Sequence, residues 1–151
     1  MYSLVRRYIK TAIAFLVVGL TLGGWMIAIR ELSHGVASQY LVSAHTHAIF
    51  VGFVMMMILG VALWLFPRPD KTDQRYRPAF AEAAYWLVSV GTAGRIAGEL
   101  GRIRFDAAAL RWFVVIAGFV QIAGILLFFY TMWSRIRGVG SQTREARGER
   151  F

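Results

Sequence analysis

Three histidines, His34, His45 and His47, are the residues of this 151-residue chain best suited to bind a metal or a cofactor. His45 and His47 lie in an apolar stretch over residues 40–66, where an ionisable side chain is costly and usually serves a function. The plainer alternative is a pair of neutral imidazoles that hydrogen-bond to neighbouring helices. Because the chain has no cysteine, a metal would be held by histidine, methionine, carboxylate or backbone oxygen.

The spacing of His45 and His47 determines whether the two side chains can bind the same ligand. Two steps along an α-helix turn by about 200°, so the two side chains point to nearly opposite sides of one helix. They cannot share one compact ion, but they can serve two sites, as in a helix that lies between two flat cofactors. His34 lies in the preceding loop and could fold back toward His45. A haem-free copper or zinc site that uses all three histidines therefore stays open.

Four apolar segments must position these histidines, and a membrane-spanning helix needs roughly 20 such residues. Hydrophobic residues make up 58% of the chain, which is more than a small soluble domain can bury. We therefore predict an all-α integral membrane four-helix bundle over residues 1–137, followed by a basic, disordered tail over residues 138–151. The helices are expected at about 9–30, 40–66, 79–100 and 110–135.

The basic residues indicate the orientation of the bundle. Most of them lie at the start of the first helix, between the second and third helices, and in the tail. The formal net charge is +9. Basic residues in short loops favour the cytoplasmic side, so we expect both termini in the cytoplasm and the protein in the inner (cytoplasmic) membrane. Contacts with the lipid bilayer explain the charge, and no nucleic-acid partner is expected. The first apolar segment is too long for a cleaved signal peptide and should remain as a helix.

The stretch over residues 44–68 contains His45-Thr46-His47, then Gly52 and Gly60, and it ends in Pro67-Arg68. With these features it resembles the tenth helix of the haem–copper oxidase catalytic subunit. The C-type oxidases are most similar, with the nitric oxide reductases as relatives. In that superfamily the first histidine of the pair binds the high-spin haem and the second binds the low-spin haem. The resemblance therefore implies haem b, iron protoporphyrin IX, as the cofactor.

Several parts of the oxidase are missing from this chain. It lacks the further histidines that hold copper, the His-Pro motif of the copper helix, its partner tyrosine, and the helix that supplies the other axial histidine of the low-spin haem. We therefore predict no catalytic residues and lean against an enzyme.

The oxidase subunit has twelve helices in an approximate threefold arrangement of four-helix arcs, and this chain resembles one arc. The resemblance thus implies a homotrimer with haem between protomers, bound by His47 of one and His45 of the next. A homodimer with haem between two second helices, or a bond from haem to His34, are the alternatives.

Arginines near the histidine end of the helices are candidates to bind the haem propionates, as arginines do in the resembled subunits. Arginine pairs carboxylates well. Lipid headgroup contacts are the alternative, and Arg95 could instead pair with Glu99 one turn along. Phe50 is a candidate to pack on a porphyrin face. The propionate candidates are Arg95, Arg102, Arg104 and Arg111.

Taken together, these features predict a membrane-bound b-type cytochrome that transfers single electrons to an unidentified redox partner. Two histidine ligands leave the iron no open position, which favours electron transfer. One alternative is a gas-binding sensor or reductase for nitric oxide or oxygen, which needs a five-coordinate haem. The other is a haem-free copper- or zinc-binding or structural membrane subunit.

Overall fold

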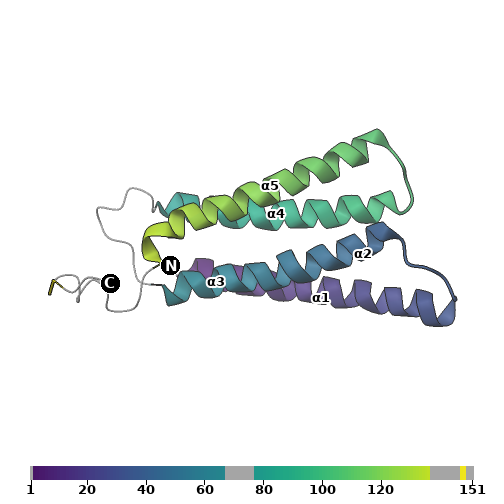
Figure 1. Cartoon of the computed structure of the whole chain (residues 1–151), viewed down its shortest axis with the longest axis horizontal. Helices are drawn as coiled ribbons and strands as arrows, with labels where there is room; N and C mark the ends of the chain where they lie inside the picture. The colour runs from purple at the N-terminus through teal and green to yellow at the C-terminus, as the bar shows by residue number, and fades with distance from the viewer. Residues whose placement is uncertain (1, 67–76, 137–146, 149–151) are drawn as a thin grey trace.

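The computed structural model describes residues 2–66, 77–136 and 147–148, and every regular element among them is helical (Figure 1). This confirms the predicted all-α membrane bundle of four long helices. Most of the predicted tail, residues 138–151, and the Pro67-Arg68 pair lie outside the described residues. The elements are α1 (Tyr2–Leu32), α2 (Gln39–Thr46), the π-helix η1 (His47–Met55), α3 (Met56–Leu65), α4 (Pro78–Arg102), α5 (Ala108–Met132) and the short 3₁₀ helix η2 (Trp133–Arg135).

Three stretches of the described chain are long and apolar enough to cross a membrane: Ser3–Leu32, Gln39–Leu65 and Ala108–Arg135. The fourth long helix, α4, is less apolar because it contains Glu82, Arg95 and Glu99. Of these, Glu99 is buried and Arg95 is half-buried, so α4 turns its central charged groups away from lipid. This is the usual arrangement for ionisable residues within a span.

The elements α2, η1 and α3 form one continuous helix over residues 39–65, called here the histidine helix. It begins after Ser38, whose hydroxyl accepts a hydrogen bond from the backbone N–H of Tyr40. It ends at Phe66, which is extended, as expected for a residue that precedes a proline. Its central nine residues are π-helical, and the wider π turns begin at His47. Such segments are rare and are often found at functional sites.

The histidine helix lies between α1 and α4, and α5 packs along the other side of α4 (Figure 1). The molecule therefore consists of two antiparallel pairs, α1 with the histidine helix and α4 with α5. Residues 33–38 and 103–107 connect the helices at one end, called here the loop end. The start of α1 and the end of α5 lie at the opposite, terminal end.

Two clusters of buried side chains hold the bundle together. The larger one, toward the terminal end, includes residues from α1, α3, α4 and α5, and in it Tyr8 makes edge-to-face contacts with Tyr85 and Phe128 at 5.1 and 6.0 Å between ring centroids. The smaller cluster lies nearer the histidines and includes no buried residue of α5. Its buried members are Leu22, Leu41, Ala44, Ala48 and Ile96.

Candidate functional site

His45 and His47 face different neighbours, as their spacing predicts. His45 lies against α1, with Nδ1 2.8 Å from the carbonyl oxygen of Gly19. His47 lies against α4, with Nδ1 3.4 Å from Oε2 of Glu99. The histidine helix therefore presents one imidazole to each of its two flanks.

Each imidazole bonds a backbone carbonyl through the same ring nitrogen. Nδ1 of His45 reaches the carbonyl of Gly19, and Nδ1 of His47 reaches that of Ser43, both at 2.8 Å. A carbonyl oxygen can only accept, so each Nδ1 must carry the hydrogen. In the neutral ring this leaves the lone pair on Nε2, for which neither histidine has a hydrogen-bond partner among the described residues. Metal-binding histidines characteristically have this arrangement.

A groove of about 500 Å³ opens beside His45, which is within the usual size range of small-molecule and cofactor sites. Its lining is mostly apolar, and Arg30 and His45 are its ionisable members. Gly23 keeps the space open, because a Cβ there would lie 3.0 Å from Cε1 of His45. The Arg30 side chain is 74% exposed and pairs with Glu31 at 2.7 Å. The other lining residues are Met26, Ile27, Gly35, Val36 and Ala37.

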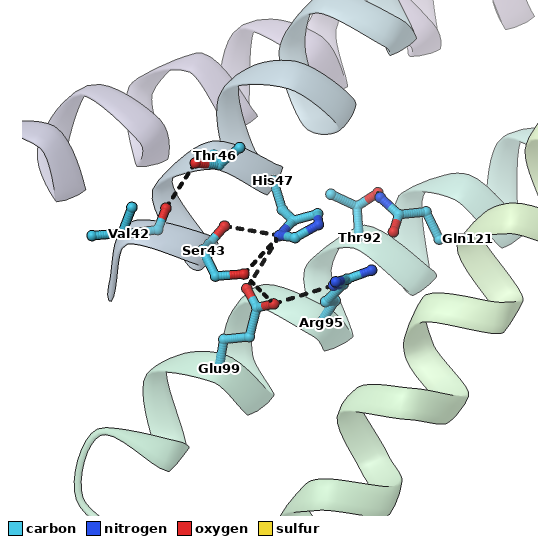
Figure 2. Close-up of polar contacts among 8 residues, drawn as sticks. All are labelled: Val42, Ser43, Thr46, His47, Thr92, Arg95, Glu99 and Gln121. Carbon is cyan, nitrogen blue, oxygen red and sulfur yellow. Dashed lines mark hydrogen bonds and ion pairs between the residues drawn. The ribbon is translucent and has the colours of Figure 1, made fainter. Parts of the chain in front are cut away.

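The surroundings of His47 are polar and more enclosed (Figure 2). The Ser43 hydroxyl donates to Oε1 of Glu99 at 2.7 Å, and Nε of Arg95 donates to the same oxygen at 3.2 Å. The side chain of Glu99 is only 4% exposed, and its Oε2 is buried with no hydrogen-bond partner within the described ranges. Figure 2 shows the far side of the His47 ring turned toward Thr92, whose hydroxyl accepts a bond from Gln121 at 3.1 Å.

Two of the predicted propionate-binding arginines meet at the loop end. Nη2 of Arg102 donates to the Tyr40 hydroxyl at 2.6 Å and to Asp106 at 2.9 Å, and Arg102 stacks over the Tyr40 ring. Arg111 donates to both carboxylate oxygens of Asp106. The hydrogen bond from Arg111 holds the pKa of Asp106 below its usual range. Tyr40 lies two helical turns before His47, so these cations are on the loop-end side of the histidines.

Of the remaining predicted site residues, His34, Phe50 and Arg104 lie apart from this arrangement. His34 is exposed in the loop after α1, with φ of 51°, and Phe50 is 65% exposed. Arg104 is exposed at the loop end, whereas Arg95 pairs with Glu99 beside His47. In the portion of the chain that the structure describes, no three histidine or acidic side chains converge on a possible metal position. One protomer therefore does not gather His34, His45 and His47 into a single site.

The residues around the histidines carry at most a partial signal of this role in the sequence. Ser43 precedes His47 by four positions and so shares its helix face, which is a local signal. Gly19 and Gly23 are four apart, a spacing that favours close helix packing without identifying the side chain that fills the space. The contact of Glu99 with His47 joins two distant helices and has no local signature.

The family model described as "Cytochrome C and Quinol oxidase polypeptide I" matches residues 5–98, more than half of the chain. The match includes most of α1, the whole histidine helix and most of α4. No curated protein and no solved structure matches the chain.

Proposed function

The chain belongs to the cytochrome c and quinol oxidase polypeptide I family, and on that premise we propose that it is a membrane b-type cytochrome that holds haem through His45 and His47. The observation that carries the proposal is the use of Nδ1 by both imidazoles to bond a backbone carbonyl. This fixes the ring orientation and leaves Nε2 of each for iron. Haem bound there would supply one-electron redox chemistry.

The two flanks of the histidine helix are different, which bears on how protomers would assemble. Each flank of one protomer offers a single imidazole, so a six-coordinate haem needs its second ligand from elsewhere. In a ring of protomers, one surface of each copy contacts a different surface of the next copy. In a twofold dimer, the same surface of both copies forms the contact. We therefore favour a homotrimer with haem between protomers, bound by His47 of one protomer and His45 of the next. His34 is the alternative ligand, because it is adjacent to Gly35 in the lining of the groove.

Cations at the loop end would meet the haem propionates. Arg102 and Arg111 are already aligned by Asp106, and Arg30 lines the groove beside His45. Guanidinium groups bind carboxylates through paired, charge-assisted hydrogen bonds. We assign Arg95 to Glu99 instead, because these two side chains are bonded one helical turn apart.

Electron transfer to and from an unidentified redox partner is the role that best fits two histidine ligands, since the iron then has no open position. A second function is favoured if the protein acts as a monomer. One protomer offers one imidazole on each flank, so a haem bound to it alone would be five-coordinate and could bind a gas. Binding of carbon monoxide to the reduced protein separates the two functions.

The test is the visible spectrum of the full-length protein in detergent, oxidised and reduced, together with its native mass. We expect sharp reduced α and β bands of a six-coordinate b haem in the wild type. His45→Ala and His47→Ala should each lose haem or become high-spin, whereas His34→Ala should keep the wild-type spectrum. A loss of haem or a high-spin spectrum in His34→Ala would instead favour His34 as the alternative ligand. A carbon monoxide shift in the wild type would favour the gas-binding function. Wild-type protein without haem, even after reconstitution, would contradict both.

A further inference from the structure

We propose that Glu99 is a positioning residue for His47 and that its carboxylate lowers the reduction potential of the haem that His47 holds. The inference rests on the proposed function, because it concerns haem bound through that histidine. Glu99 is the buried carboxylate of α4, a helix that packs against the histidine helix. A carboxylate in such a place is costly to maintain, so its partners indicate its use.

The hydrogen bonds of Glu99 are distributed unevenly over its two oxygens. Oε1 accepts from the Ser43 hydroxyl at 2.7 Å and from Nε of Arg95 at 3.2 Å. Oε2 accepts none from the described residues, although it is buried, and it lies 3.4 Å from Nδ1 of His47. The less neutralised oxygen is therefore the one next to the imidazole.

Ser43 connects the carboxylate to the same ring by a second route. Its carbonyl oxygen accepts from Nδ1 of His47 at 2.8 Å, while its hydroxyl donates to Glu99. The N–H of His47 thus lies among a carbonyl, a hydroxyl and a carboxylate (Figure 2). Acceptors around this hydrogen draw it away from the ring, which makes Nε2 more basic and a stronger ligand.

Both effects favour ferric over ferrous haem. The oxidised cofactor carries one more positive charge, which a nearby carboxylate stabilises more strongly in a low-dielectric interior than in water. A more basic imidazole also donates better to ferric iron. Arg95 has the opposite charge and partly cancels the effect of Glu99, so the two residues should move the potential in opposite directions.

The experiment is a potentiometric titration of the full-length, haem-loaded protein, with the low-spin electron paramagnetic resonance signal as a readout of the axial ligands. Glu99→Gln should favour the reduced form about tenfold, an upward shift of about 59 mV for a one-electron couple. Arg95→Gln should lower the potential, and the double variant should lie near the wild type. The matched control is Glu82→Gln, the same change on the same helix at an exposed carboxylate that pairs with Arg7.

Different outcomes overturn different claims. Equal potentials in the wild type and in Glu99→Gln overturn this inference and leave the cytochrome intact. Shifts of the same sign in the Glu99 and Arg95 variants also overturn it, because they indicate a purely structural disturbance. If the Glu99→Gln variant holds no haem, the reduction potential of the Arg95→Gln variant is the deciding measurement. An unchanged or raised potential in Arg95→Gln overturns the inference. Wild-type protein without haem overturns the proposed function, and this inference with it.

Discussion

The two histidines obtain their hydrogen-bond acceptors from different sources. The acceptor of His47 belongs to its own helix, since Ser43 lies one turn earlier, so the ring is oriented as soon as the helix forms. The acceptor of His45 belongs to α1, so that ring is oriented only once two helices pack together. Gly19 supplies the carbonyl and Gly23 supplies the space, which makes the α1 contact a condition for the proposed binding of haem by His45.

Gly23→Ala should therefore weaken haem binding at His45. The new methyl carbon would lie 3.0 Å from Cε1 and 3.4 Å from Nδ1 of the ring, so the ring must shift by a few tenths of an ångström, which strains its bond to Gly19. We expect lower haem content or a high-spin fraction, with a loss of stability on the order of one hydrogen bond, about 0.5–1.5 kcal/mol. Gly24→Ala is the control, because a methyl there meets no atom within 4 Å. Identical spectra for the two variants would show that Gly23 does not position His45.

At the scale of residues, the sequence predicts contacts within one helix but not contacts between helices. The opposed directions of His45 and His47 follow from helical geometry alone, and so does the pairing of Arg95 with Glu99, observed at 3.2 Å. The contacts of Glu99 with Ser43 and of His45 with Gly19 depend on how two helices align along their axes. No local pattern specifies that alignment.

Of the helix pairs, α4 and α5 approach each other most closely, and small residues at their contact make this possible. A Cβ on Gly91 would lie 2.6 Å from the backbone nitrogen of Gln121, and one on Gly124 would lie 2.7 Å from that of Val88. The backbones therefore approach directly, as is common where helices associate in lipid. The contact also buries the Thr92–Gln121 hydrogen bond, so α5 shields part of the polar face of α4.

Gly91→Ala should separate these two helices. The added methyl meets backbone atoms, which cannot rotate away, so we expect a loss of about 1–3 kcal/mol from overpacking. Gly94→Ala is the control on the same helix, because its methyl would make an ordinary contact of 3.4 Å with the side chain of Ala117. Reversible unfolding in mixed detergent micelles, followed by circular dichroism, gives the difference. Equal unfolding midpoints would mean that the pair does not depend on close backbone contact here.

The number and order of the helices could be predicted from run length and charge, but not their detailed form. The first helix extends back to Tyr2 because Val5 and Tyr8 pack into the core while Arg6 and Arg7 remain exposed. The π-helical segment over 47–55 could not be predicted. Its residues after His47 are apolar on all sides, so they show no period that would separate an α turn from a wider one.

At the scale of the whole molecule, the sequence was sufficient to predict a membrane protein and to identify its family. It was insufficient to predict how many copies assemble. The family match depends on a stretch that includes both histidines, and the apolar content specifies the environment. How many copies assemble depends on surfaces that lipid would otherwise cover, such as the exposed side of α5 with Trp112 and Phe119. In lipid, apolar exposure alone does not indicate an interface, because lipid tails are as apolar as the side chains.

The larger buried cluster joins all four helices at the terminal end and contains none of the three histidines. On the proposed function, we therefore expect two steps of biogenesis, with insertion and folding of the chain first and delivery of haem afterwards. Protein made in haem-starved cells should keep its helical circular dichroism and resist limited proteolysis between the helices. Added haem should then be taken up without prior denaturation. A chain that is degraded or unfolded until haem arrives would show that the cofactor, and not this cluster, organises the bundle.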